Sequence, residues 1–282
     1  MSTTVTPAAK AVATLAAASS PSPLRRGALY WAFADGLVLA GRQLRKIPRV
    51  PEQLVFATVQ PILFVLLFRY VFGGAIHPEG TTYPNFLMAG VFVQTVVIGS
   101  AATCVGIAED LQCGLIDRFR SLPMARSAVL TGRTLADAAR NLFTVAVMFG
   151  VGLVVGFRPQ GSPLAWLEAI VLLLLIGYAF SWVGATIGLA VRTVEAAQSA
   201  GLSWVFPLTF LSSAFVPTET MPGWLRAFAE NQPITAFIEA VRALLLDRPV
   251  GSSVAITLAW TIGVLCVFAP LSVALYRRVT TR

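Results

Sequence analysis

The side chains that usually carry chemistry are scarce in this chain of 282 residues and are scattered along it. His77 is the only histidine, and the three cysteines, Cys104, Cys113 and Cys266, lack the CxxC spacing of metal sites and form no closed disulfide framework. The sequence contains no GxxxxGKS or GxxxxGKT phosphate loop, no GxSxG nucleophile turn and no HExxH zinc motif. We therefore predict a chain that is not an enzyme, binds no metal and carries no nucleotide site.

Ionisable residues are also missing from the middle of the apolar runs. Asp137 and Arg140 stand one turn apart near one end of the third run, where we expect them to pair. A proton-coupled transporter usually needs a carboxylate or a histidine near the membrane midplane, so this pattern disfavours proton antiport. Arg69, about one turn from the end of the first run, either contacts an anionic group of a cargo or snorkels to the interface.

The composition predicts an all-α integral membrane protein. Hydrophobic residues make up 56% of the chain and charged residues only 12%, and the mean hydropathy is +0.76. Soluble domains carry about 25% charged residues, so the bilayer must be the solvent for most of this surface. A span needs about 20 residues to cross ~30 Å of hydrocarbon. Six runs approach that length: residues 53–73, 84–107, 134–156, 164–190, 200–216 and 253–276. The fifth is short and contains Pro207.

The distribution of Lys and Arg predicts the orientation. With six spans, fifteen of the 21 positive residues lie on the side that carries both termini, and four lie on the other side. By the positive-inside rule, both termini are cytoplasmic. The net charge of +8 is explained in this way, so we expect no nucleic-acid partner.

Three regions lie outside the six predicted spans. Residues 1–27 are predicted to be a disordered cytoplasmic tail. Residues 28–48 form an amphipathic helix with a basic side, which either lies on the inner leaflet or docks against the bundle. Residues 217–247 contain two short amphipathic segments that start near Pro222 and Pro233, and they form either an outer re-entrant hairpin or a helix pair lying flat.

The loop between the second and third spans combines charges with apolar residues at helical spacing. Leu115, Ile116, Phe119 and Leu122 share one face of a short helix over about 109–122, and Pro123 ends it. Such a helix either docks into the groove of another protein or rests on the membrane surface, and the pattern alone supports both readings equally.

Several strings resemble one family of transporters. They are Gly114-Leu-Ile-Asp-Arg-Phe-Arg-Ser-Leu-Pro-Met-Ala-Arg126, Phe215-Val-Pro-Thr-Glu-Thr-Met-Pro-Gly-Trp-Leu-Arg-Ala-Phe228, Asn231-Gln-Pro-Ile-Thr235, and Glu239 with Arg242. In order and spacing they resemble type-2 ABC exporter permeases of the daunorubicin-resistance type, from about residue 28 to the C-terminus. Gln232 departs from the pattern, since many members have Asn-Pro directly.

The resemblance implies a working unit of two permeases and two separate ABC ATPase subunits in a bacterial inner (plasma) membrane. Residues 28–282 would form the transmembrane domain, and 28–48 its connecting helix. ATP and Mg²⁺ would bind the partner ATPase, and the second permease would be an identical copy or a homologue. The cargo would be a drug, an antibiotic or a lipid. A polysaccharide or glycolipid exporter permease and a stand-alone secondary transporter remain the alternatives.

The resemblance also assigns roles to individual residues. Those coupling to the ATPase would be Leu115, Asp117, Arg118, Phe119, Arg120, Leu122 and Pro123. Polar candidates along the cargo path, between spans one, two and five, would be Thr58, Gln60, Gln94, Thr95, Ser203 and Thr209. The outer re-entrant hairpin would include Pro222, Trp224, Pro233, Glu239 and Arg242.

Overall fold

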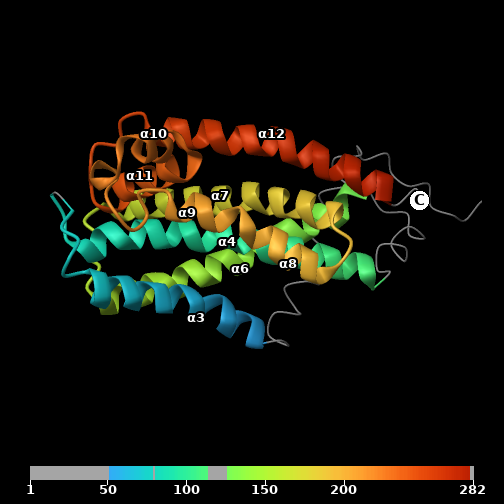
Figure 1. The fold of residues 1–282 in the computed structure, drawn as a ribbon, viewed down its shortest axis with the longest axis horizontal. Coiled ribbons are helices and arrows are strands. Elements are labelled where there is room, and N and C mark those ends of the chain that lie inside the picture. Colours follow the sequence, from blue (N-terminus) through green and yellow to red (C-terminus); the bar gives the residue numbers. More distant parts are fainter. Residues whose placement is uncertain (1–50, 79, 114–125, 280–282) are drawn as a thin grey trace, which may run out of the picture.

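The computed structural model describes residues 51–78, 80–113 and 126–279, and every regular element within these ranges is a helix. The long helices run side by side along the longest axis of the molecule (Figure 1). Their bounds are α3 Pro51–Leu67, η2 Phe68–Phe72, α4 Tyr83–Gln112, α6 Arg126–Val155, α7 Pro163–Ala190, α8 Val194–Ser203, α9 Val205–Phe210, η3 Thr218–Thr220, α10 Gly223–Asn231, α11 Pro233–Leu245 and α12 Ser253–Val279. The predicted all-α class is confirmed for this part of the chain.

Four helices are long and apolar enough to cross a membrane. They are α4, the Leu130–Val155 part of α6, α7 and α12, and in that order they match the second, third, fourth and sixth predicted spans. The first predicted span corresponds to α3 and η2, of which Thr58–Phe72 forms a shorter apolar helix. The chain is therefore a multi-pass helical membrane protein, and the count of six crossings stays a prediction.

The fifth predicted span is not one continuous helix. α8 ends at Ser203, and α9 ends at Phe210, so residues 211–216 are not helical. Pro207 supplies the reason, because it has no N–H to donate to the carbonyl of Ser203 one turn earlier. The expectation of a helix over 200–216 is wrong in this respect, although the proline that breaks it is visible in the sequence.

The ends of the helices follow local capping chemistry. The Ser162 side chain accepts a hydrogen bond from the Ala165 N–H at 3.2 Å, and Pro163 occupies the first position of α7. Thr193 caps α8 in the same way, accepting from the Ala196 N–H at 3.1 Å. These N-caps begin α7 and α8 within a few residues of the end of the preceding helix.

Helix α4 is the centre of the bundle. Its membrane-length segment is 78% buried, and α6, α7, α8 and α11 all pack against it. Two glycines of α7 permit the closest of these approaches, because a methyl group at Gly184 would overlap the Ser100 carbonyl oxygen and one at Gly188 would overlap that of Cys104. Small residues four apart are a common means of close helix packing in membranes.

Helix α12 lies at the periphery. Only 11% of its membrane-length segment is buried, and it exposes large apolar side chains such as Ile262 and Val267. A pair of hydroxyls 2.6 Å apart, Thr186 on α7 and Ser272 on α12, joins it to the bundle. Thr257 adds a hydrogen bond to the Ala236 carbonyl on α11. The exposed apolar surface of α12 suits contact with lipid.

The predicted tail (1–27), the amphipathic helix (28–48) and the coupling residues lie outside the described residues. The coupling residues concerned are Leu115, Asp117, Arg118, Phe119, Arg120, Leu122 and Pro123. Helix α4 continues through Gln112, so the start of the predicted loop helix, from 109, belongs to the span itself.

The packing of Gly90 yields a first prediction. A methyl group at Gly90 of α4 would overlap the backbone of Ala214, whereas one at Gly150 of α6 would meet nothing within 4 Å. We expect Gly90→Ala to lower stability by about 1–3 kcal/mol through overpacking. Gly150→Ala should be neutral or slightly stabilising, because Ala favours a helix by about 1 kcal/mol over Gly. Thermal unfolding of the purified protein in detergent checks both, and equal melting temperatures would contradict the packing described.

Candidate functional site

A ladder of polar contacts joins α4 to α6. Arg133 Nη1 donates to Asp110 Oδ2 at 2.5 Å, which forms the rung nearest the end of α4. Further along, Thr103 Oγ1 donates to Asp137 Oδ2 at 2.5 Å, and Arg140 Nη2 lies 3.0 Å from Asp137 Oδ1. We call these contacts the α4–α6 ladder. The local pairing of Asp137 with Arg140 predicted from the sequence is confirmed.

The register of the two helices places these groups opposite one another. Gly99, Thr103, Gly106 and Asp110 are spaced three or four residues apart, so they lie on one face of α4. The two glycines leave room for arginine side chains. The Arg133 guanidinium occupies the position that a side chain at Gly106 would need, and Arg140 Nη2 donates to the Gly99 carbonyl at 3.2 Å. The two glycines of α4 therefore leave the space that the arginine side chains of α6 occupy.

Burial makes the ladder costly to break. Asp137 is 5% exposed, and its carboxylate is satisfied by one hydroxyl and one guanidinium. Removing one partner of a buried ion pair leaves an uncompensated charge, which typically costs about 3–5 kcal/mol. The ladder thus fixes how α4 and α6 lie relative to each other, on either side of the loop that connects them.

A charge exchange tests this joint. In Asp110→Arg, two guanidinium groups face each other, and in Arg133→Asp two carboxylates do. We expect each single variant to lower the melting temperature of the purified protein in detergent by several degrees and the double exchange to restore most of that loss. Thermal unfolding measures the effect. Arg192→Asp, at an exposed position between α7 and α8, is the matched control. Failure of the double variant to improve on either single variant would contradict a direct pairing.

A second polar cluster lies at the opposite end of the bundle, centred on Arg242 of α11. Its guanidinium is 2% exposed and donates to Glu239, to the Ser213 carbonyl at 2.9 Å and to the Phe86 carbonyl at 3.2 Å. The guanidinium carbon also lies 3.8 Å from the centre of the Phe86 ring. Ser213 Oγ donates to Glu239 at 2.9 Å. We call this set the Arg242 clamp, because it ties α11 both to α4 and to the turn that follows α9.

Neighbouring contacts strengthen the same joint. Gln232, the residue between α10 and α11, donates its amide to the Leu208 and Leu211 carbonyls at 3.0 and 2.5 Å. These are carbonyls that the end of α9 leaves without helical partners. Tyr83 donates to the Phe215 carbonyl at 3.2 Å. Gln232, which departs from the pattern of the similar sequences, therefore has a structural role in capping α9. The sequence alone did not predict this role.

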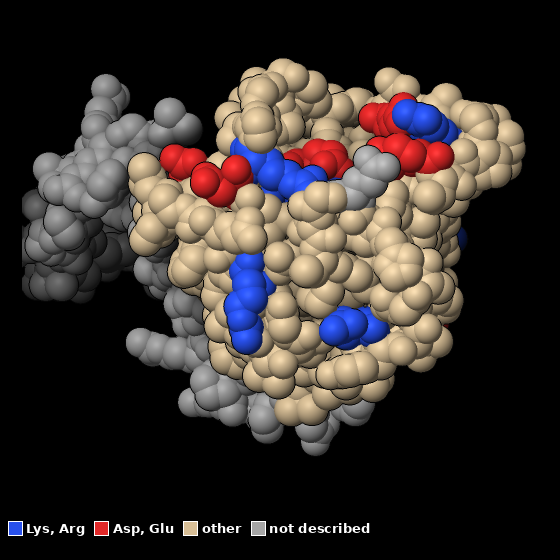
Figure 2. Space-filling model, turned by 90° about the vertical axis from the view of Figure 1, so that its left-hand side faces the viewer, with Lys and Arg blue, Asp and Glu red and all other residues tan. Residues whose placement is uncertain are grey.

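Seen end-on, this part of the molecule carries few charges. Acidic and basic side chains gather in a band across one side, and most of the remaining surface is uncharged (Figure 2). Helices α10 and α11 lie at this end, and the C-terminal end of α12 points to the other (Figure 1). Of the predicted hairpin residues, Pro222 and Pro233 stand at the starts of α10 and α11, and Trp224 is 77% exposed.

The clamp yields a stability prediction. Arg242→Met would leave the buried Phe86 and Ser213 carbonyls without this donor and would remove the cation that pairs with Glu239, so we expect a loss of stability of at least about 2 kcal/mol. Arg226→Met is the matched control, since Arg226 and Glu230 form an ion pair of the same kind on the surface of α10, with half-exposed side chains. That control should keep its melting temperature in detergent. Equal melting temperatures of Arg242→Met and Arg226→Met would show that Arg242 does not hold α11 against α4.

The six polar residues predicted along a cargo path fall into two groups. Gln94, Thr95 and Thr209 are buried inside the subunit, whereas Thr58, Gln60 and Ser203 keep exposed surface. All four hydroxyls donate to carbonyl oxygens of their own helix, three or four residues earlier. The Gln94 amide nitrogen meets no acceptor among the described residues. In this conformation the hydroxyls are satisfied without a cargo.

An aromatic cluster between α3, η2 and α9 was not anticipated. Phe64, Phe68 and Phe72 recur every four residues, and the Phe68 ring stacks on Phe215 with centroids 4.1 Å apart. Phe210 lies 5.1 Å from Phe215. The four-residue spacing could have indicated the stripe. Its partners depend on the break in the fifth helix, which places Phe215 beside it.

Arg69 lies within η2, a single π-helical turn. Its side chain is half-buried, and the guanidinium carbon lies 5.8 Å from the centre of the Tyr70 ring. Such π-turns occur often at functional sites. This position leaves both sequence-based readings of Arg69 open. Among the described residues, no three His, Cys, Asp or Glu side chains gather closely enough to hold a metal ion.

The fold and its two polar joints define a multi-pass helical membrane protein. Comparison with known proteins identifies the family. Residues 36–246 match the ABC-2 type transporter family, and the chain belongs to it. It is the permease subunit of an ATP-driven exporter and works with an ABC ATPase.

Three relatives illustrate the similarity. The chain is 34% identical to the daunorubicin resistance ABC transporter permease protein DrrB1 of Streptomyces coeruleorubidus, over 84% of this chain and 83% of that protein. It is 31% identical to a protein of Mycobacterium tuberculosis named a probable doxorubicin resistance ABC transporter permease protein, DrrC, over 88% and 90%. The doxorubicin resistance ABC transporter permease protein DrrB of the same organism is 26% identical over 86% and 84%. The predicted resemblance is confirmed.

Proposed function

We propose that the chain exports hydrophobic or amphiphilic compounds of the drug or antibiotic class. The observation that carries this proposal is its similarity, over most of its length, to permeases named for daunorubicin and doxorubicin resistance. Both compounds combine fused aromatic rings with a polar sugar. The apolar and aromatic surface of α3, η2 and α9 suits such cargo better than it suits a polysaccharide. Of the predicted path residues, Thr58, Gln60 and Ser203 are the ones exposed to meet it.

The proposed topology has six crossings and two cytoplasmic termini. α3 with η2 would form the first crossing, and the broken pair α8 and α9 the fifth. The excess of Lys and Arg on the side of the termini supports this orientation. Helices α10 and α11 would then form the outer re-entrant hairpin, held by the Arg242 clamp. Backbone of this kind is tolerated at membrane depth where protein covers it.

The proposed coupling path starts at the loop between α4 and α6. Asp117, Arg118 and Arg120 would make charge-assisted contacts with the ATPase, while Leu115, Phe119 and Leu122 would fill an apolar cleft, and Pro123 would direct the chain back to the membrane. Because the α4–α6 ladder joins the two helices on either side of this loop, a displacement of the loop would move both helices together. The ATP and Mg²⁺ that drive the movement would bind the partner.

The proposed assembly has two permeases and two ATPases. The outward face of α3 and η2 exposes Val55, Leu63, Tyr70 and Val71 at 53–70% of their possible surface. A second permease, identical or homologous, would cover this face.

Co-purification tests the central proposal. The tagged protein is extracted from native membranes in mild detergent, and we expect an ATPase with Walker motifs in comparable amount. Phe119→Ala combined with Arg118→Ala should reduce the co-purified ATPase at least several-fold without lowering the melting temperature of the permease. Arg192→Ala, a cation on the same proposed side, serves as the control. A protein free of ATPase that still moves doxorubicin into liposomes would overturn the coupling scheme and favour a secondary transporter.

A further inference from the structure

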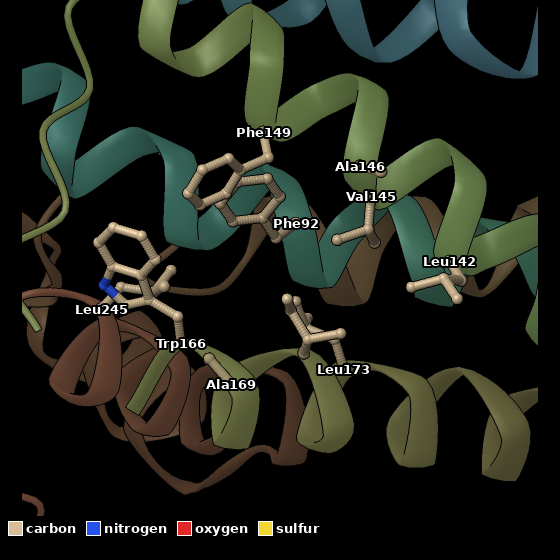
Figure 3. Close-up of a pocket in the computed structure, with 10 residues that line it drawn as sticks. Phe92, Leu142, Val145, Ala146, Phe149, Trp166, Ala169, Leu173 and Leu245 are labelled. Carbon is tan, nitrogen blue, oxygen red and sulfur yellow. The ribbon is translucent and has the colours of Figure 1, made fainter. Parts of the chain in front are cut away.

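An apolar groove lies between α6 and α7. It encloses about 250 Å³, and its floor is formed by Phe92 of α4 and its end by Leu245 of α11. Figure 3 shows the Phe92 and Phe149 rings on one side of the hollow and Leu173 on the other. None of the ten lining side chains is charged, and the indole of Trp166 supplies the one polar atom among them. Nothing in this lining could recognise a polar ligand.

The groove opens toward a flank that suits only hydrocarbon. Leu142, at its rim on α6, is 44% exposed. Neighbouring positions on α7 are also apolar and exposed, with Leu167 at 57% and Val171 at 56%. Both helices contain membrane-length apolar segments, so this flank lies against lipid tails rather than water. An occupant therefore arrives from the bilayer.

The volume of the groove limits which molecules of the bilayer can occupy it. An apolar cavity of about 150 Å³ accepts benzene. Pockets for drug-sized molecules hold about 300–1,000 Å³. At about 250 Å³, the groove is larger than one ring and smaller than a fused-ring drug requires. A single flexible hydrocarbon chain fits both this volume and the purely apolar lining.

We propose that one acyl chain of a membrane phospholipid is retained in this groove as part of the folded protein. The chain would fill the space between α6 and α7 and contact Leu245, the last residue of α11. It would thereby support the helix that the Arg242 clamp fixes at its other side. Trp166, in the first turn of α7, marks the end of the groove where the glycerol region would lie, since Trp favours that depth. The retention of this lipid follows from the packing of α6 and α7 in the membrane and does not require the exported compound to be known.

Brominated lipid tests retention. Bromine on an acyl chain quenches a Trp that it touches. The protein is reconstituted in phosphatidylcholine that carries bromine near the glycerol end of an acyl chain, at the depth proposed for Trp166, and is then extracted into detergent, which strips loosely associated lipid. Trp166→Phe and Trp260→Phe variants isolate the two contributions, and Trp260 on α12 is 44% exposed and serves as the reference for loose lipid. We expect Trp166 to keep more than half of its quenching while Trp260 recovers fully. Equal recovery of both would overturn the proposal.

A filling substitution tests the site. Ala146→Phe places a ring in the groove and should abolish the retained quenching together with the co-purified phospholipid phosphorus. Val154→Phe, on the same helix and 88% exposed outside the groove, should change neither. Ala146→Leu is a smaller filling, for use if the first variant fails to fold. Phospholipid retained in a folded Ala146 variant would exclude a lipid bound in this groove. Phospholipid displaced from the native protein by doxorubicin would also exclude a structural lipid and would indicate a cargo site instead.

Discussion

The hydrocarbon core of a bilayer offers no water to a polar group, and α4 meets this constraint at both of its ends. Near one end, the Asp110 and Asp137 carboxylates accept from Arg133 and Arg140 of α6, which lie over glycines of α4, and Asp137 also accepts from the Thr103 hydroxyl. At the other end, the Phe86 carbonyl and ring of α4 receive Arg242. Between them, α4 is buried among apolar side chains of its neighbours. Helices α6, α7, α8 and α11 pack directly on this central helix, and α12 joins the bundle through α7 and α11.

This arrangement connects the two ends of the molecule through a single rigid element. The 30 residues of α4 correspond to about 45 Å at 1.5 Å per residue, enough to span the bilayer and its interface. The ladder and the clamp are polar joints with defined geometry, whereas the long middle is held by dispersion and close helix packing. Movement applied at the loop end therefore has a continuous, stiff path to the hairpin end. Coupling through packed helices of this kind is a general route for transmitting conformational change.

The sequence predicted the four long crossings because twenty or more consecutive apolar residues have one stable solution in a bilayer. It predicted the starts of α10 and α11 through Pro222 and Pro233. It did not predict the partners of Thr103, Asp110 and Arg242, because those depend on the register between helices far apart in the chain. The sequence placed Asp137 and Arg140 one turn apart, and their local pairing is the part of the ladder that such spacing can reveal.

The polar candidates for a cargo path illustrate the same limit. Thr and Ser within a span attract attention because they are polar, yet the hydroxyls of Thr95, Ser203 and Thr209 donate to carbonyls of their own helix. The aromatic cluster around Phe68 and Phe215 was overlooked because phenylalanine is abundant, with 18 in the chain. Pro207 indicates a break in this helix, but the sequence does not show that the chain after the break places Phe215 against Phe68.

The α4–α6 ladder also has an electrical consequence. It pairs two carboxylates, Asp110 and Asp137, with two guanidinium groups, Arg133 and Arg140, so its net charge is zero. Moving one unpaired charge through a membrane potential involves about 2.3 kcal/mol per 100 mV. Because the ladder moves as a neutral unit, its displacement would do no net work against the voltage across the membrane. Displacement of the ladder alone would therefore cost the same free energy in energised and de-energised cells.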